Sequence, residues 1–401
     1  MTTDDQTEPL MDGCEFGDSQ LEAAMRERLR ARLGEGRPLR VYAGYDPSAP
    51  DLHLGHSITL RKLREFQRLG HDVTVVVGTM TATIGDTSDR LAGRARRSAA
   101  DVQEAATTYA DQVFTILDRD RSAVVTNSEW LAELRLPEVL DLASQFTVQQ
   151  FLARDNYKRR LNQGEPVGLH EFFYALLQGY DAVHLRADVQ LGGTEQLFNI
   201  LAAAKLQEAL GQPPCVALTF PILLGVDGVE RMSKSRGNYI GIAEAPEEQF
   251  GKVMSISDDT MLQWAGLVTD WTATEVDAFG DAVRSGELHP MVAKKRLAHE
   301  VVEMYHGDAA ATRAMQHFER VHQHGHQAAL VPEVVVAQPI ALVELLVDLG
   351  AAASRSSARR LIAGGGVSID GERVDAIDVL VAAPATIKVG PRRFYNVVRS
   401  P

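Results

Sequence analysis

Two histidines three positions apart are the first side chains whose spacing suggests chemistry. His53 and His56 lie in the segment Pro-Ser-Ala-Pro-Asp-Leu-His-Leu-Gly-His, residues 47–56. In a helical turn, side chains at i and i+3 face the same side, and Gly55 between them lets a ligand approach the backbone. The first turn of a helix also offers unpaired N–H groups to a phosphate. An isolated His-x-x-His is more often a surface pair or half of a metal site, but no third ligand of matching spacing follows. The segment therefore suits a triphosphate.

A basic loop far downstream is the second candidate. Arg231-Met232-Ser233-Lys234-Ser235 follows an apolar stretch and a glycine-containing turn at 224–228. Two cations beside small hydroxyl residues on a mobile loop could close over the β and γ phosphates and stabilise the charge that develops as pyrophosphate leaves. Taken alone, such a loop is more often a solvated basic turn, so its meaning depends on the histidine pair.

The apolar pattern places both segments on one sheet. A strand at 39–44, a loop running into a helix at 51–69 and a strand at 73–77 form a βαβ unit, which predicts a parallel sheet and an α/β, Rossmann-like fold. Ligands of such sheets bind at the carboxyl ends of the strands, so we expect the site in the loops after Ala43, Val77, Val189 and Phe220. Further strands are expected at 123–126, 183–189 and 216–220, with helices at 19–33, 99–117 and, with breaks, 136–162.

The remaining sequence predicts several domains. Residues 1–36 form an N-terminal helical segment, and residues 37–240 form the Rossmann-like domain with a helical insert at about 131–168. From 241 to 323 the strands stop and helical stretches dominate, as at 245–253 and 291–307. Residues 324–339 contain Gly325, Pro332 and Pro339 and indicate a linker. Residues 340–401 predict a small α+β unit with helices at 340–349 and 354–363, a strand at 367–369, an Asp-Gly hairpin turn at 370–371 and strands near 374 and 387.

Taken together, the histidine segment and the basic loop resemble the signature pair of the class I aminoacyl-tRNA synthetases. The other motifs resemble the bacterial tyrosyl-tRNA synthetases over essentially the whole chain from about Leu39. Two late segments, at 354–356 and 371–374, resemble an S4-type RNA-binding domain. The earlier matching motifs are Tyr-Ala-Gly-Tyr-Asp-Pro at 42–47, Ile-Gly-Asp at 84–86, the trio Tyr174, Gln178 and Asp181, and Gly-Gly-Thr-Glu-Gln at 192–196.

The resemblance implies a tyrosine–tRNA ligase. Such an enzyme activates L-tyrosine with ATP to tyrosyl-adenylate, releases pyrophosphate, and transfers the tyrosyl group to the 3′ end of tRNA(Tyr). ATP would arrive with Mg²⁺, and neither a tightly bound cofactor nor a metal site built by the protein is expected. The implied catalytic residues are His53, His56, Arg231 and Lys234, with Arg90 and Arg94 on a second mobile loop. The implied ATP contacts are Ser48, His53, Gly55, His56, Gly193, Glu195 and Lys234.

The same resemblance implies a tyrosine pocket. Tyr42 and Asp181 would pair the phenol hydroxyl, and Gln196 would help to place the carboxylate. The acceptors of the α-ammonium would be Asp86, Tyr174 and Gln178. The spacing of Tyr174, Gln178 and Asp181 describes one helix face, which is more often a packing surface. Buried Gln and Asp are costly on a packing face unless they are paired, so this face favours a polar pocket.

Charge along the chain points to the tail as a place for RNA. The net charge of −13 excludes an indiscriminate nucleic-acid binder, because phosphate affinity comes mainly from Lys and Arg. Residues 335–401 carry eight Lys or Arg and six Asp or Glu, a net charge of +2, which leaves −15 for the first 334 residues. We therefore expect contacts to tRNA(Tyr) from Arg355, Arg359, Arg360, Arg392 and Arg393. The resemblance also implies a homodimer, with the insert at about 131–168 as its interface.

Composition excludes several other classes of protein. Apolar residues make up 45% of the 401, enough for a core, and no apolar run approaches the roughly 18 to 20 residues of a membrane span. The acidic start does not predict a secretory signal, so we expect a cytoplasmic protein without membrane partners. Cys14 and Cys215 are too few and too far apart for a disulfide framework.

Three departures from the family pattern keep alternatives open. The basic loop begins with Arg231 where Lys is usual, Glu195 replaces a usual Asp in the ribose loop, and Thr87 replaces a usual Pro. A paralogue that charges a modified tyrosine, or that serves secondary metabolism or resistance, fits these changes. An enzyme for tryptophan and a catalytically silent RNA-binding regulator are further alternatives. The retained histidines, Lys234 and pocket acids argue against the regulator.

Overall fold

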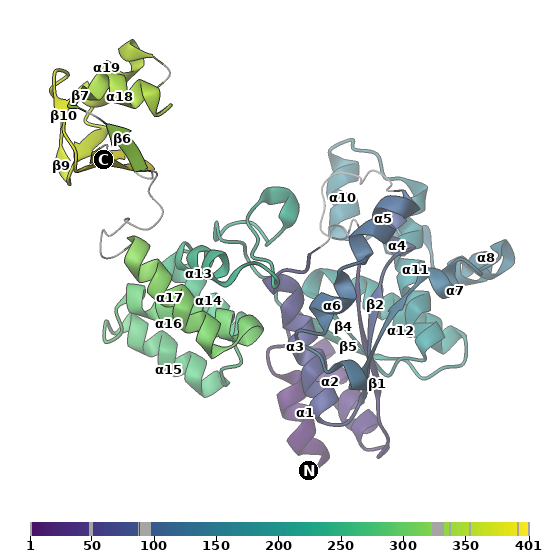
Figure 1. Cartoon of the computed structure of the whole chain (residues 1–401). Coiled ribbons are helices and arrows are strands. Elements are labelled where there is room, and N and C mark those ends of the chain that lie inside the picture. The colour runs from purple at the N-terminus through teal and green to yellow at the C-terminus, as the bar shows by residue number, and fades with distance from the viewer. Residues whose placement is uncertain are drawn as a thin grey trace. The chain divides into compact units, whose positions relative to one another are not determined.

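The computed structural model describes residues 2–47, 51–86, 88, 98–322, 333–336, 338–352, 354–390 and 393–399. The chain divides into two compact units, 1–315 and 316–401, which are described separately (Figure 1). Among the helices of these described ranges, none has both the length and the apolar character needed to cross a bilayer.

The first unit is built on a five-stranded sheet with the strand order β3-β2-β1-β4-β5, and every neighbouring pair is parallel. The chain runs outward from β1 to β3 and then returns to the other side of β1 with β4, so the strand order reverses between β1 and β4. Open sheets bind ligands at this reversal. The α/β class predicted from the sequence is confirmed. The strands are β1 (Arg40–Tyr45), β2 (Asp72–Val77), β3 (Ser122–Thr126), β4 (Val189–Gly193) and β5 (Val216–Phe220).

Helices cover both faces of this sheet, which explains why β2 and β5 are apolar at nearly every position. In Figure 1 the sheet lies between α3 and α6 on one side and α11 and α12 on the other. The helices are α1 (Thr3–Met11), α2 (Ser19–Leu33), α3 (Leu54–Arg68), α4 (Thr81–Ile84), α5 (Ala99–Ala106), α6 (Tyr109–Val113), α7 (Ser128–Leu131), α8 (Leu136–Ser144), α9 (Val148–Leu152), α10 (Asp155–Asn162), α11 (Leu169–Leu185) and α12 (Leu197–Ala209).

Two local predictions were wrong, and one helix of the N-terminal helical segment was not predicted. The strand expected at 183–189 begins only at Val189, because α11 continues to Leu185 and ends at Arg186, whose φ of 48° is left-handed. The single helix expected at 99–117 is broken into α5 and α6. Helix α1 was missed, although Thr2 and Asp5 form a capping box at its start.

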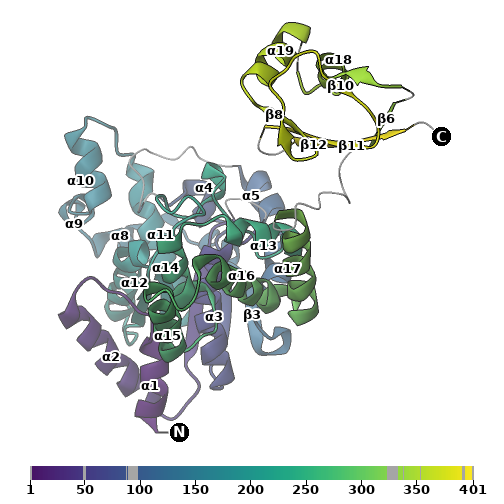
Figure 2. The same ribbon diagram turned by 90° about the vertical axis from the view of Figure 1, so that its left-hand side faces the viewer.

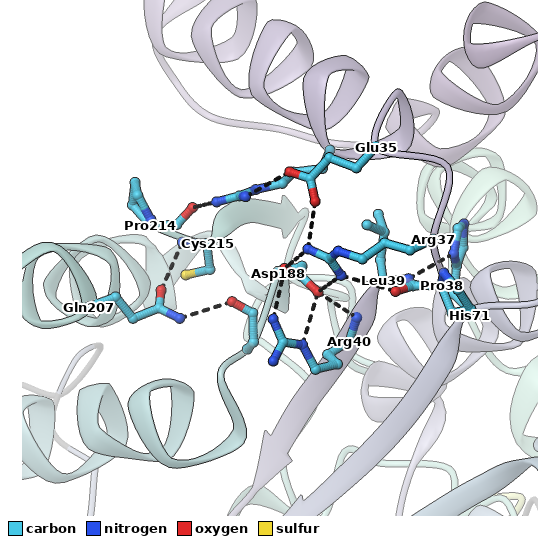
Figure 3. Close-up of polar contacts among 12 residues, drawn as sticks. Glu35, Arg37, Pro38, Leu39, Arg40, His71, Asp188, Gln207, Pro214 and Cys215 are labelled. Atoms are coloured by element: carbon cyan, nitrogen blue, oxygen red, sulfur yellow. Dashed lines mark hydrogen bonds and ion pairs between the residues drawn. The ribbon is translucent and has the colours of Figure 1, made fainter. Parts of the chain in front are cut away.

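The amino ends of β1 and β4 are joined by a buried carboxylate, Asp188 (Figure 3). The guanidinium of Arg37 donates two hydrogen bonds of 2.8 Å to Asp188, and Arg40 donates its backbone N–H at 2.8 Å and its Nε at 3.1 Å. Burial raises the pKa of Asp188, but these donors outweigh burial and hold the pKa well below its ordinary value. This charge cluster lies at the end of the sheet opposite the carboxyl ends.

A group of helices follows the sheet in the first unit. Arg61 and Arg64 of α3 hold Asp270, with N–O distances of 3.0 and 2.6 Å, and Arg61 also donates to the carbonyl of Leu267 at 2.7 Å. Figure 2 shows α14 beside α3 and α16. Because α3 begins at the histidine pair, one helix connects that pair to these helices. They are α13 (Pro246–Met254), α14 (Asp258–Val268), α15 (Ala273–Arg284), α16 (Pro290–His306) and α17 (Asp308–His322), of which α17 continues past the boundary between the units at residue 315.

The second unit is a small α+β domain with the sheet order β6-β12-β11-β8-β9 and a two-stranded β10-β7 ribbon. Residues 333–336, expected to belong to a linker, form β6 and pair in parallel with β12. The hairpin turn has positive φ at Asp370 and Gly371, as an Asp-Gly type I′ turn requires. Its elements are β6 (Glu333–Val336), β7 (Ile340–Ala341), α18 (Leu342–Asp348), α19 (Arg355–Ala363), β8 (Val367–Ile369), β9 (Glu372–Arg373), β10 (Leu380–Val381), β11 (Ala385–Val389) and β12 (Arg393–Arg399).

Candidate active site

A cavity of about 330 Å³ opens at the carboxyl ends of β1, β4 and β5. Its volume falls within the range of small-molecule sites, and its position is the reversal of strand order between β1 and β4. The structure brings many of the residues singled out in the sequence to this one cavity. Those that line it are Tyr42, His53, Gly55, His56, Asp86, Tyr174, Gln178, Asp181, Gly193, Glu195, Gln196, Arg231 and Lys234.

One end of the cavity is a buried polar pair, Tyr42 on β1 and Asp181 on α11. Trp130 Nε1 donates to Asp181 Oδ1 at 2.8 Å, and Asn127 Nδ2 donates to Oδ2 at 3.2 Å. Burial still dominates and raises the pKa of Asp181 to about 8. The hydroxyl of Tyr42 is buried and has no hydrogen-bond partner among the described residues. A ligand hydroxyl placed here would satisfy both groups.

The neighbouring wall centres on a second carboxylate, Asp86. Its Oδ2 accepts from Gln196 Nε2 at 2.7 Å, and its Oδ1 accepts from the backbone N–H and the hydroxyl of Ser88 at 2.9 and 2.6 Å. The hydroxyl of Tyr174 donates to Asp46 Oδ2 at 3.1 Å. This wall therefore presents two carboxylates, which suits a cationic group on a ligand.

The other end of the cavity contains the histidine pair at the start of α3. The backbone N–H of Gly55 donates to His53 Nδ1 at 3.1 Å, and the backbone N–H of His53 donates to His56 Nδ1 at 3.1 Å. A Cβ on Gly55 would lie 3.0 Å from the ring of His53, so the imidazole packs directly on the glycine. Burial lowers the pKa of His53 and lowers that of His56 to about 4. Both rings are therefore neutral near pH 7, with Nδ1 as acceptor and the proton on Nε2.

The basic loop lies against this histidine end. Met232 is buried and its N–H donates to the carbonyl of Leu223 at 2.8 Å, while Asn238 Oδ1 accepts from Ser233 N at 2.8 Å. Lys234 Nζ forms an ion pair with Asp51 and lies 5.2 Å from the ring centroid of Tyr239. Burial lowers the pKa of Arg231. Two cations and two neutral histidines thus converge on one end of the cavity.

The loop after β4 forms the remaining wall. The carboxylate of Glu195 folds back over Gly193, where any Cβ would collide with it. Glu195 Oε2 is buried without a hydrogen-bond partner in the described part of the chain, and burial raises the pKa of this carboxyl. A ligand that donates a hydroxyl would satisfy that oxygen.

The other candidate residues fall elsewhere. Arg355, Arg359 and Arg360 lie on α19 of the second unit, all exposed, and Arg355 pairs with Glu344 at 2.8 Å. Arg393 begins β12. Ser48, Thr87, Arg90, Arg94 and Arg392 lie outside the described residues.

Several polar residues of the cavity were not predicted from the sequence. Asp46 and Asn127 follow the carboxyl ends of β1 and β3, so the strand-end rule could have found both. Gln190 interrupts the apolar pattern of β4, and its buried Oε1 has no partner among the described residues. Nothing in the sequence pattern identifies Trp130, which reaches Asp181 only through the tertiary fold.

Comparison with known proteins agrees with this geometry. The model of a family described as "tRNA synthetases class I (W and Y)" matches residues 34–323, and a model of a "Tyrosine--tRNA ligase SYY-like C-terminal domain" matches residues 325–398. The tyrosine–tRNA ligase of Geobacter sulfurreducens is 44% identical over 94% of this chain and 95% of the relative. That of Aquifex aeolicus is 41% identical over 99% and 100%.

Solved structures extend the likeness to the fold. The tyrosyl-tRNA synthetase of Archaeoglobus fulgidus, solved with L-tyrosine, has a TM-score of 0.61 at 22% identity, covering 78% of this chain and 99% of that structure. The truncated mitochondrial enzyme of Aspergillus nidulans has the same TM-score over 80% and 94%. The chain belongs to the class I tRNA synthetases of the tryptophan and tyrosine family, and within that family to the tyrosine–tRNA ligases.

Proposed function

We propose that the cavity carries out both steps of tyrosine–tRNA ligation, with tyrosine between Tyr42 and Asp86 and the triphosphate of MgATP between the histidines and the basic loop. The observation that supports this proposal is the composition of the two ends. One end offers a buried Tyr-Asp pair and an acidic wall, and the other offers cations and neutral N–H donors in the same cavity.

In the first step, a carboxylate oxygen of tyrosine attacks the α phosphorus of ATP in line. The new O–P bond forms as the bond to the β-phosphate oxygen breaks, and pyrophosphate leaves with the electron pair. No enzyme nucleophile is needed, so catalysis is positioning and stabilisation of the developing charge. His53 and His56 donate from Nε2, and Arg231 and Lys234 neutralise the departing phosphates. Ser48, Arg90 and Arg94 are proposed to assist from the ATP side.

Selection of tyrosine rests on the phenol hydroxyl. It would donate to Asp181 and accept from Tyr42. Phenylalanine would leave the buried hydroxyl of Tyr42 without a partner, at a cost of roughly 1 to 3 kcal/mol, while Asp181 would keep only its bonds from Trp130 and Asn127. Asp86 would accept from the α-ammonium with Tyr174 and Gln178, and Gln196 would orient the carboxylate. Gly193 and Glu195 would meet the ribose and Gly55 the triphosphate.

In the second step, a terminal ribose hydroxyl of tRNA(Tyr) attacks the carbonyl carbon of the adenylate and AMP leaves. We propose residues 37–240 as the catalytic domain, 241–323 as the domain beside the anticodon region, and 333–401, which includes β6, as the S4-type domain. In the S4-type domain, Arg355, Arg359, Arg360, Arg392 and Arg393 would contact RNA phosphates. We propose a cytoplasmic location for this enzyme.

A homodimer is proposed through the helical insert at about 131–168. This region and the start of α11 expose large apolar side chains, and contiguous exposed apolar surface marks protein interfaces. Their relative exposures run from 49% to 72%, for Leu136, Leu140, Val148, Leu161 and Leu169.

The test is exchange of labelled pyrophosphate into ATP, measured with tyrosine, phenylalanine and tryptophan in turn. Exchange that depends on tyrosine alone, followed by charging of tRNA(Tyr), is expected. Exchange supported better by tryptophan or by a ring-modified tyrosine would move the assignment to one of the alternative substrates. No exchange with any amino acid would favour a silent RNA-binding protein.

A further inference from the structure

Arg154, at the junction of α9 and α10, is a cation that the assigned roles leave unexplained. It belongs to the helical insert, yet its Nη2 donates a 2.7 Å hydrogen bond to the hydroxyl of Ser88, which lies beside Asp86. Its guanidinium lies over two aromatic rings, 4.6 Å from the centroid of Phe198 and 5.2 Å from that of Tyr157. Burial lowers the pKa of Arg154, and the charge of Asp86 opposes that shift. A cation held this way has one described polar partner, Ser88, which makes that contact worth explaining.

The hydrogen bonds at Ser88 have a fixed direction. Its Oγ lies 2.7 Å from Arg154 Nη2, 3.1 Å from Asn199 Nδ2 and 2.6 Å from Asp86 Oδ1. The arginine and amide nitrogens can only donate, so they use the two lone pairs of the hydroxyl oxygen. The hydroxyl proton must then go to Asp86. Arg154, the closer of the two donors, therefore acts with Asn199 to direct the hydroxyl of Ser88 toward Asp86.

The consequence appears at the two oxygens of Asp86. Oδ1 accepts both the N–H and the hydroxyl of Ser88, which uses its two lone pairs, whereas Oδ2 accepts only from Gln196 among the described residues. The Oδ2 atom thus keeps one lone pair for a ligand. Asp86 lines the cavity and Arg154 does not, so Arg154 acts on a ligand indirectly, and its hydrogen-bonded connection to the cavity runs through Ser88 and Asp86.

We propose that Arg154 is a positioning residue for tyrosine binding: through Ser88 it orients Asp86 so that Oδ2 accepts a hydrogen bond from the α-ammonium. This inference rests on the proposed role of Asp86. It also assigns a specific task to the insert, because α9 and α10 bury Phe151 and Tyr157 and bring Arg154 to the amino-acid end of the cavity.

Arg154→Gln is the direct test, with Arg159→Gln as the matched control, because Arg159 is an exposed arginine of α10 and loses the same charge. In tyrosine-dependent pyrophosphate exchange, Arg154→Gln should raise KM for tyrosine about tenfold or more, the loss expected for one hydrogen bond to a charged group, with kcat and KM for ATP nearly unchanged. Arg159→Gln should behave as the wild type.

Two competitive inhibitors separate positioning from general damage. Tyramine keeps the ammonium group of tyrosine and lacks the carboxylate. 3-(4-Hydroxyphenyl)propanoate keeps the carboxylate and lacks the ammonium group. Arg154→Gln should weaken the binding of tyramine, seen as a higher inhibition constant, and should leave the inhibition constant of 3-(4-hydroxyphenyl)propanoate unchanged. If the variant binds both inhibitors equally less tightly, Arg154 has only a structural role. If it binds only the propanoate less tightly, Arg154 positions the carboxylate of the substrate. Either result overturns the proposal.

Ser88→Ala keeps the proposal testable if Arg154→Gln does not fold. It removes the connecting hydroxyl and leaves the arginine in place, so it should reproduce the tyramine-selective loss, and the double variant should be no worse than the more affected single variant. A wild-type enzyme with no tyrosine-dependent exchange would refute the proposed function. A wild-type enzyme with normal exchange and an unaffected Arg154→Gln variant would refute only the role of Arg154.

Discussion

Lys234 Nζ is ion-paired with the carboxylate of Asp51 at the nucleotide end of the cavity. Two backbone hydrogen bonds of 3.0 Å hold the chain segments on either side of this pair together. Leu54 N–H donates to the carbonyl of Ile240, and Ile242 N–H donates to the carbonyl of Leu52. These bonds join the chain before α3 to the chain after the basic loop. The side chains of Lys234 and Asp51 are 18% and 44% exposed, so the pair is worth less than about 1 kcal/mol and a polyphosphate can replace it.

Asp51→Asn should therefore lower KM for ATP by about two- to fivefold at low salt, because a carboxylate that competes for Lys234 and repels the triphosphate is removed. The effect should shrink with added salt, and KM for tyrosine should not change. Asp72→Asn, at the amino end of β2, loses the same charge far from the cavity and serves as control. A higher KM for ATP in Asp51→Asn would mean that Asp51 assists nucleotide binding, for example through Mg²⁺.

Replacing each histidine of the pair by Gln or by Asn tests which ring nitrogen acts in catalysis. The Nδ1 atoms of His53 and His56 accept from the backbone, so Nε2 is the atom left to donate to phosphate. Gln places its amide near the Nε2 position and Asn places it near Nδ1. We expect His53→Gln and His56→Gln to retain at least about tenfold more kcat for adenylate formation than the Asn variants, because one transition-state donor is worth a few kcal/mol. Better activity in the Asn variants would show that helix capping is the main role.

The same two rings predict the acid side of the pH profile. Burial holds the pKa of His56 at about 4 and lowers that of His53, so the ring of His56 stays neutral between about pH 7.5 and 5.5 and protonation of His53 is displaced in the same direction. The wild-type rate of adenylate formation under saturating substrates should therefore not show a histidine titration in this range. A step near pH 6.5 that disappears in His56→Gln would contradict the buried, neutral pair.

Asp181 predicts a pH dependence of stability. Burial raises its pKa from the ordinary 3.8 to about 8, so between these values the folded protein holds a proton that the unfolded chain has released. Stability should fall as pH rises through this window, by at most about 1.4 kcal/mol per pH unit, and level off above it. Asp181→Asn does not titrate, so its Tm relative to the wild type should rise from about pH 5 to pH 8 in calorimetry. A constant difference would show that Asp181 is ionised in the free enzyme.

The sheet could be predicted from the sequence because most of its strands have a recognisable apolar pattern of their own. β1, β2, β3 and β5 are short apolar runs bounded by turns, and each was placed within one or two residues. The strand at 183–189 was predicted to begin too early because Ala-Val-His-Leu at 182–185 satisfies a strand pattern equally well, whereas α11 continues to Leu185 and packs against α12. Tertiary contacts override local preference at such points.

Some residues of the cavity could also be predicted from the sequence, and others could not. His53, Gln178 and Lys234 could be named from the sequence because each lies in a short motif that resembles a motif of the family. Trp130 and Arg154 could not, because their partners, Asp181 and Ser88, lie far away in the sequence and only folding brings them together. The hydrogen bonds that support a site from distant parts of the chain are therefore the feature that is hardest to predict from a single sequence.

The second unit gives the last prediction. Its sheet includes β6, which pairs with β12, so a clean truncation must end at His322, after α17, and not within residues 333–336. The cavity is lined entirely by residues of the first unit. Chain 1–322 should therefore keep tyrosine-dependent pyrophosphate exchange within about twofold, and should lose tRNA charging by more than about tenfold in kcat/KM, because binding to phosphates supplies much of RNA affinity.

A full-length variant separates the effect of three side chains from the effect of removing a whole domain. Arg355→Gln, Arg359→Gln and Arg360→Gln, combined, change exposed side chains of α19 and leave the apolar core of this unit intact. This variant should weaken tRNA binding and reduce its salt dependence by about one unit of slope for each phosphate that is no longer neutralised, with pyrophosphate exchange unchanged. If the triple variant charges tRNA with the wild-type KM and salt slope while chain 1–322 fails to charge it, the second unit binds RNA through another face than α19.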